Sequence, residues 1–280
     1  VLGRGWDESL LAEGRHPNRH DLDAVSPDNP VVIHRVWNKL VCNSAALRVV
    51  GIDRNTPDPP ADVLYSGSFE RDENGEPTGL FRDRAKDLIT DNVPPYTEDQ
   101  RVAAIAEGCR AYNATGLTGV AEPGLYPNEI AAYTRARREG KLTVRTDMLI
   151  AAWGFGAPEN EAELEKNIAF IGTGGSFGDD LLRLEGVKFM IDGGMSDRTA
   201  RMFEPYLDQP DHRGTWVVEP VRLVKLIRYI HDLGWPMDIH TCGDEAHQHT
   251  PATVGEDAQA VSGDERGRAG TASVGNRAAG

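Results

Sequence analysis

Basic residues are scarce in this sequence, where 30 lysines and arginines stand against 44 aspartates and glutamates, a formal charge of −14. Nucleic acids and anionic membranes bind basic surfaces, so neither is expected as a main partner. No stretch approaches the roughly 18 consecutive apolar residues that a membrane-spanning helix needs. No basic and apolar signal segment opens the chain, which begins at Val1.

Cysteine is also rare, with Cys42, Cys109 and Cys242 far apart and no CxxC pair among them. An odd number of dispersed cysteines argues against a disulfide framework and favours a reducing compartment, so we expect a cytoplasmic protein. Cys242 is interpreted as a packing residue and not as a nucleophile. The residues GGSFG at 174–178 fit the GxSxG pattern of serine hydrolases, but they follow a helix-like segment, whereas a nucleophile elbow follows a strand. The glycine-rich segment 172–180 also lacks the lysine of a phosphate-binding loop.

Residues 1–92 indicate a small, irregular α/β segment. A β-branched run at 30–36 predicts a strand, and residues 42–52 predict a helix capped by Asn43 or Ser44 and ended by Gly51. The Asn74-Gly75 pair is typical of a β-hairpin turn.

Helix-like and strand-like segments alternate from residue 93 to residue 249, which favours a parallel α/β architecture. The predicted helices are 97–116, 128–141, 161–172 and 220–234, and the predicted strands are 117–124, 142–153, 182–194 and 236–244. Residues 250–280 have too few large apolar side chains to bury a core, so this tail is predicted to be disordered.

The period-two alternation of the last two predicted strands places their polar residues on one face. Lys188 alternates with Val187 and Phe189, and His240 alternates with Ile239. If the apolar faces pack on helices, Lys188 and His240 point into a barrel interior near the carboxyl ends of their strands, where barrel active sites lie.

Several motifs together resemble one known family. In chain order they are GRGWDES, RHDLDAVSPDNPVVIHR, VCNSAALRVVGI, NTPDP, RDENGEPTGLFRD, GLTGVAEPG, GKLTVR, LEGVKFMIDGGMSDRTARMFEPY and IHTCGDEA. This series is similar to amidohydrolase family 3 of the amidohydrolase superfamily, which includes N-substituted formamide deformylase-like enzymes. The resemblance covers about residues 3 to 248.

The resemblance implies an α/β fold: an incomplete, distorted (β/α)8 TIM-type barrel with the small segment 1–92 inserted at its N-terminal side. It also implies a metal-dependent hydrolase of amide or formamide C–N bonds, with one or two divalent ions, zinc being the expected metal. Lys188 matches the family's CO2-carboxylated lysine, and His240 matches the first of its later histidine ligands. Asp192, Arg198 and Thr199 match a stretch that the family places beside the site.

The chemistry of this ligand set is consistent with hydrolysis by a metal-activated water. Burial disfavours the ammonium form of a lysine, and the neutral amine can take up CO2 to form an anionic carbamate able to bridge two cations. Metal-activated water then attacks the carbonyl of a small amide-type substrate. Glu122, which ends a predicted strand, and Trp6 are further candidates for lining the site. The sequence leaves open whether two copies of the chain form a homodimer.

The sequence also departs from the family pattern. It has no HxH pair on a first barrel strand: His247-Gln248-His249 has the spacing but follows the last predicted strand, and His16 and His20 have the wrong spacing. The family's second later histidine and terminal-strand Asp are not found. The catalytic residue is therefore unassigned, and we expect this chain to be incomplete and inactive alone. The alternative is a non-catalytic α/β fragment, or a small-molecule binding module, without a bound metal.

Overall fold

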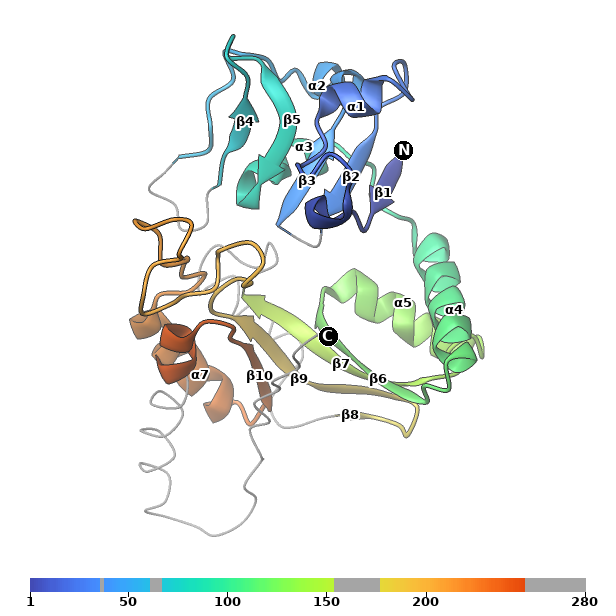
Figure 1. Cartoon of the computed structure of the whole chain (residues 1–280). Helices are drawn as coiled ribbons and strands as arrows, with labels where there is room; N and C mark the ends of the chain where they lie inside the picture. The colour runs from blue at the N-terminus through green and yellow to red at the C-terminus, as the bar shows by residue number, and fades with distance from the viewer. Residues whose placement is uncertain (36–37, 61–66, 154–176, 250–280) are drawn as a thin grey trace. The chain divides into compact units, whose positions relative to one another are not determined.

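The computed structural model describes residues 1–35, 38–60, 67–153 and 177–249. The chain divides into two compact units, Val1–Pro95 and a second that begins at Tyr96 (Figure 1). The predicted helix at 161–172 and the predicted disordered tail at 250–280 lie outside the described residues.

The first unit is built on a five-stranded mixed sheet in the order β1-β2-β3-β5-β4. β1 runs parallel to β2, and the other neighbours are antiparallel. The strands are β1 Leu2–Arg4, β2 Val32–Arg35, β3 Lys39–Cys42, β4 Phe69–Arg71 and β5 Pro77–Arg82. The helices are η1 Glu8–Leu10, α1 Arg19–Asp23, α2 Ser44–Val50, η2 Asp83–Lys86 and α3 Asp87–Thr90.

Local sequence signals account for the elements of this unit. The Asn43 side chain caps α2 by accepting the backbone N–H of Ala46 at 2.9 Å, and Gly51 ends the helix with a left-handed φ of 73°. The Asn74-Gly75 turn joins β4 to β5, which confirms the predicted hairpin. The core of the unit includes Phe81, whose ring stacks on Phe69 at 5.0 Å between centroids.

The second unit is built on a curled parallel sheet in the order β10-β9-β7-β6, with short β8 antiparallel to β9 (Figure 1). Its strands are β6 Gly119–Leu125, β7 Arg145–Trp153, β8 Phe177–Gly178, β9 Leu182–Met190 and β10 Met237–His240. Its helices are α4 Glu98–Ala114, α5 Pro127–Arg138 and α7 Pro220–Asp232. The predicted alternation of helices and parallel strands is confirmed over these residues, and the closed (β/α)8 barrel stays a prediction.

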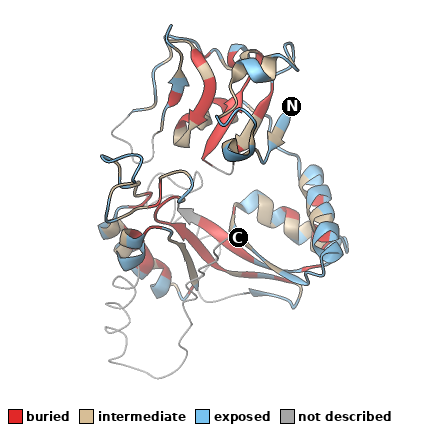
Figure 2. Cartoon of the chain, in the orientation of Figure 1, coloured by how far each residue is buried: buried red, intermediate tan, exposed pale blue. Residues whose placement is uncertain are grey.

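The helices of the second unit form where the sequence predicts them. Thr97 and Gln100 make a reciprocal capping box at the start of α4. On α7, Leu223, Leu226 and Ile230 recur at helical spacing and are all buried, while residues on the opposite face are exposed (Figure 2). Among the helices in the described ranges, none has the length and apolar character needed to cross a membrane.

Candidate functional site

The candidate site lies where β9 and β10 run side by side and end. Asp238 pairs with Lys188, and His240 pairs with Met190. Residues paired across neighbouring strands point to the same face, and so do residues two apart along a strand. The register therefore confirms that Lys188 and His240 share one face of the sheet. Their role as metal ligands stays a prediction.

Lys188 is buried in this face, with 8% of its surface exposed. Its Nζ atom lies 3.6 Å from Oδ2 of Asp238, whose side chain is 31% exposed. A buried cation needs a charged partner, and Asp238 supplies it. The sequence pattern put Asp238 on the face of His240 but did not identify it as the partner of Lys188, because that pairing depends on the register between two strands.

His240 ends β10 and has two neighbours at its Nε2 atom. The carbonyl oxygen of Gly193 lies at 3.2 Å, and the Sγ atom of Cys242 lies at 3.4 Å. Burial raises the pKa of the Cys242 thiol and Asp192 raises it further, while Lys188 opposes these effects. The charges of Asp192 and Lys188 thus both act on Cys242. Cys242 was interpreted as a packing residue, but it is exposed and contacts the imidazole.

Asp192 joins the segment after β9 to the segment after β10. It is fully buried, and its carboxylate accepts backbone N–H groups from Arg201 at 2.9 Å, Cys242 at 2.9 Å and Gly243 at 2.7 Å. Burial raises the pKa of Asp192, and these three hydrogen bonds oppose the rise. Asp192 therefore fixes the backbone beside His240, whereas its predicted contact with substrate stays a prediction.

Two glycines permit the close approach of these segments. A Cβ atom at Gly243 would lie 1.8 Å from the carbonyl oxygen of Arg201, and one at Gly193 would lie 2.0 Å from Oγ1 of Thr199. Neither position has room for a larger residue. The Thr199 hydroxyl also accepts the backbone N–H of Gly194 at 3.0 Å, so this predicted site residue shapes the loop.

Arg198 lies in the same loop, with a left-handed φ of 58° that is uncommon for a residue with a side chain. Its guanidinium binds the carboxylate of Asp208, with the closest contact at 2.9 Å, and the side chain is 39% exposed. The structure thus pairs Arg198 with an acid of its own loop, and its predicted contact with substrate is untested.

Glu122 lies on the other face of the sheet. It pairs with Met148 of β7, and its Oε2 atom accepts the hydroxyl of Tyr133 on α5 at 3.0 Å. A β-bulge at Met148/Leu149 interrupts the alternation of faces, so the position of Glu122 could not be read from its own strand. The structure does not bring Glu122 together with Lys188.

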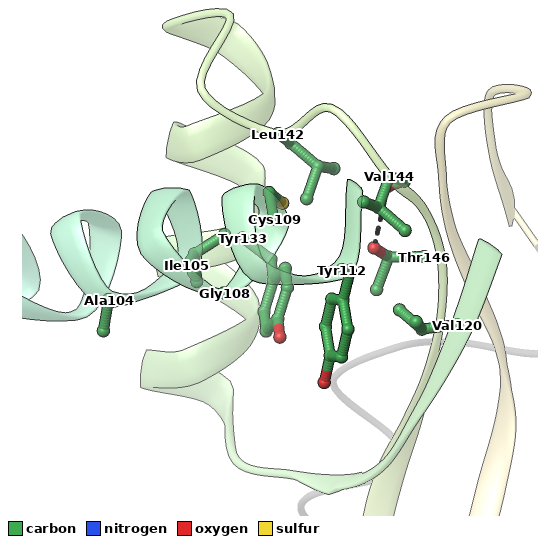
Figure 3. Close-up of a pocket in the computed structure, with 10 residues that line it drawn as sticks. All are labelled: Ala104, Ile105, Gly108, Cys109, Tyr112, Val120, Tyr133, Leu142, Val144 and Thr146. Atoms are coloured by element: carbon green, nitrogen blue, oxygen red, sulfur yellow. Dashed lines mark hydrogen bonds between the residues drawn. The ribbon is translucent and has the colours of Figure 1, made fainter. Parts of the chain in front are cut away.

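A cavity of 210 Å³ opens between α4, α5 and the start of β6 and β7 (Figure 3). Its lining is mainly apolar and includes Ile105, Cys109, Tyr133 and Leu142. The hydroxyl of Thr146 in its wall donates to the carbonyl of Val144. Among the described residues, no acid, lysine, arginine or histidine lines this cavity.

Trp6 belongs to the first unit, where its ring meets His16 edge-on at 5.3 Å between centroids. Glu8, beside it, accepts the guanidinium of buried Arg35 at 2.5 Å. Burial lowers the pKa of His16, and the Glu8 carboxylate opposes this. The predicted role of Trp6 in lining the site stays a prediction.

The donor chemistry at the end of β10 fits a divalent metal of the zinc type. The imidazole of His240 and the thiol of Cys242 lie 3.4 Å apart there, and both groups are zinc ligands in many proteins. Within the described residues, no three His, Cys, Asp or Glu side chains already form a cluster that could hold an ion. The role of Lys188 as a further ligand stays a prediction.

Replacing Asp192 tests its structural role. Asp192→Ala leaves three backbone N–H groups, one buried and two partly buried, without an acceptor, so we expect a loss of unfolding free energy of about 3 kcal/mol. Urea denaturation measures this loss, and hydrogen exchange is expected to accelerate at Cys242 and Gly243. The control is Asp208→Ala, which removes an exposed ion pair and costs less than about 1 kcal/mol. Equal losses of unfolding free energy in the two variants would contradict the structural role assigned to Asp192.

The burial of Glu122 predicts a pH-dependent effect. Its pKa is raised by burial and by Glu129, although the Tyr133 hydroxyl opposes this. Because the folded-state pKa exceeds the unfolded value, ionised Glu122 costs stability as the pH rises above about 4.5. Glu122→Gln, which does not titrate, should become more stable than the parent protein between about pH 4 and about pH 7.

Urea denaturation across this pH range checks the difference in stability. The control is Glu107→Gln on α4, which removes an exposed pair with Arg110 and should show no such trend. A stability difference that stays constant with pH for Glu122→Gln would show that burial does not control this carboxyl.

Comparison with known proteins identifies the family. The sequence profile described as "Amidohydrolase family" matches residues 1–278. YtcJ of Bacillus subtilis (strain 168), a protein named as an amidohydrolase, is 34% identical over 256 residues, which are 89% of this chain and 45% of YtcJ. The N-substituted formamide deformylase of Arthrobacter pascens is 35% identical over 147 residues, or 51% of this chain and 26% of that enzyme.

A solved structure supports the same relationship. The metal-dependent hydrolase from Pyrococcus horikoshii OT3 matches with a TM-score of 0.65 and 26% identity, over 92% of this chain and 47% of that one. The chain spans about half the length of YtcJ. The profile match and these relatives together show that the chain belongs to the amidohydrolase family.

Proposed function

We propose that this chain carries part of the active site of a metal-dependent hydrolase that acts on non-peptide C–N bonds of amide or formamide type. The observation that carries the proposal is the placement of Lys188, which is buried, and His240, which is partly buried, on one face of two adjacent parallel strands, near their carboxyl ends. The family, and the hydrolases among its relatives, agree with this chemistry. The proposed scaffold is a distorted (β/α)8 barrel, whose active site lies at that end of the strands.

Lys188 is proposed to act as a carbamate formed with CO2. In the structure it faces Asp238 at 3.6 Å, a separation that suits an ammonium–carboxylate pair. Carbamylation would replace the positive charge of Lys188 by a negative one, so two anions would face each other in a partly buried site. That arrangement is costly unless a cation lies between them or beside them. We therefore infer that carbamylation and cation binding are coupled.

When bound, a divalent ion, proposed to be zinc and present as one or two ions, supplies Lewis-acid chemistry that polarises a carbonyl and makes water nucleophilic near neutral pH. His240 would hold it through the imidazole, which Asp192 positions by fixing the backbone at Cys242 and Gly243. The substrate is proposed to be a small amide-type molecule, and the location to be the cytoplasm.

The rival proposal is a non-catalytic α/β fragment or binding module without a metal. Lys188 and His240 alone are fewer than the three protein ligands typical of a catalytic zinc. We therefore expect no turnover by the 280-residue chain alone in an amide-hydrolysis assay. A measurement of bound metal separates the two proposals more directly than an activity assay does, because only the first proposal requires the chain to bind a metal ion.

The first experiment measures zinc binding by the purified chain in bicarbonate buffer, by equilibrium dialysis and elemental analysis. We expect Lys188→Ala and His240→Ala each to weaken zinc binding at least about tenfold, because each removes one ligand of a small set. The matched control is Lys141→Ala, which removes an exposed lysine paired with Glu139 and should leave binding unchanged. Absence of bound zinc in the parent chain, or binding that survives both ligand substitutions, would refute the proposed site.

The second experiment detects the carbamate by 13C NMR after addition of 13C-labelled bicarbonate. We expect a protein carbamate signal that grows when zinc is added and is absent from Lys188→Ala. Because Asp238 opposes the anion, Asp238→Asn should increase the signal in zinc-free protein several-fold. A signal independent of zinc and of Asp238 would show that carbamylation and cation binding are uncoupled.

A further inference from the structure

The cavity between α4, α5 and the starts of β6 and β7 is a feature of the second unit that the proposed function does not use (Figure 3). Val120 near the start of β6 and Thr146 near the start of β7 both line it. Lys188 and His240 lie near the carboxyl ends of their strands, and all four of these strands run parallel. The cavity therefore lies toward the opposite end of the sheet from the candidate metal site.

Gly108 leaves the cavity open on the side of α4. It lies inside this helix, where a glycine is less favourable than an alanine. Neither of the usual reasons for a glycine applies, because its φ is not positive and a Cβ atom there would meet no neighbouring segment within 4 Å. The missing side chain thus serves no packing contact within the described residues, and it leaves space in the cavity that Gly108 lines.

The lining has the chemistry of a site for an aromatic molecule. Two tyrosine rings, Tyr112 and Tyr133, and the thiol of Cys109 contribute to it. Aromatic rings pack favourably against one another and against sulfur. The aliphatic part of the lining includes Ile105, Val120 and Leu142. A charged molecule would lose its water here and gain no charged partner among the lining residues, so the cavity favours a neutral one.

The size and shape of the cavity limit the ligand further. A protein cavity of about 150 Å³ can hold benzene, and this one measures 210 Å³, which suits a single ring with a small substituent. The hydroxyl of Tyr133 donates to Glu122 at 3.0 Å, so the wall that this ring forms is already fixed. Tyr112 is 40% exposed, and its hydroxyl points the same way as that of Tyr133 (Figure 3). A polar substituent can therefore reach water or a hydroxyl at the opening.

We propose that this cavity is a binding site for a neutral molecule with one aromatic ring and at most one small polar substituent. Binding is non-covalent, and the removal of apolar surface from water drives it. The site is separate from the metal site of the proposed function and does not depend on it.

The test titrates the 280-residue chain with benzyl alcohol and follows the methyl resonances of Ile105, Val120 and Leu142 by NMR. We expect saturable shifts of these resonances, with a dissociation constant of about 1 mM or less. Benzyl alcohol should also raise the melting temperature, because it binds the folded chain. Benzoate has a similar size but carries a charge, so it should bind at least about tenfold more weakly.

A variant that fills the cavity tests its location. Gly108→Leu should weaken the binding of benzyl alcohol at least about tenfold and raise the melting temperature of the free chain, because it removes a glycine from a helix and buries apolar surface. Gly108→Ala, a smaller change, should weaken binding several-fold and serves if the leucine variant does not fold. The matched control is Ala111→Leu, which adds the same side chain at an exposed position of α4 outside the cavity and should leave binding unchanged.

Absence of methyl shifts with benzyl alcohol would refute the proposed site. Binding that is equally strong in the parent chain and in the folded Gly108 variants would refute it as well. Equal binding of benzoate and benzyl alcohol would contradict a preference for neutral molecules. None of these results bears on zinc binding, so the proposed hydrolase site is tested separately.

Discussion

The parallel pairing of β9 with β10 is the interaction on which the candidate site depends. Its register sets Asp238 opposite Lys188 and brings His240 to the same face two residues later. A slip of one residue would turn every side chain of one strand to the opposite face and separate these groups. The three hydrogen bonds to Asp192 hold the segments that follow the two strands, so backbone order continues to the residues after His240.

The burial of Lys188 adds a constraint on charge at this strand pair. Lys188 is buried, and a buried charge is tolerated only with a partner. As an ammonium it has Asp238, and as a carbamate it would need a cation. The same residue therefore links the folding of the strand pair to its proposed chemistry, since each charge state of Lys188 calls for a different partner at the same place.

Much of the local structure could be predicted from the sequence, because the signals are local. Asn43 and Gly51 define α2, and Thr97 with Gln100 defines the start of α4. Strand periodicity also placed Lys188 and His240 on a common face. Their proposed roles came from the resemblance to amidohydrolases and not from the pattern itself.

The rest depends on relations between segments far apart in the chain. The pairing of Lys188 with Asp238 requires the register of two strands separated by the whole of α7 and its loops. The face of Glu122 depends on a β-bulge in the neighbouring strands. The contact between Cys242 and His240 depends on how Asp192 bends the backbone after β10. None of these leaves a periodic signal.

The most direct test of the account is the anomalous difference density of crystals grown with zinc and bicarbonate. The account predicts a zinc peak within about 2.0–2.3 Å of an imidazole nitrogen of His240 and of the modified end of Lys188. A crystal with zinc elsewhere, or with these two side chains on opposite faces of the sheet, would contradict it.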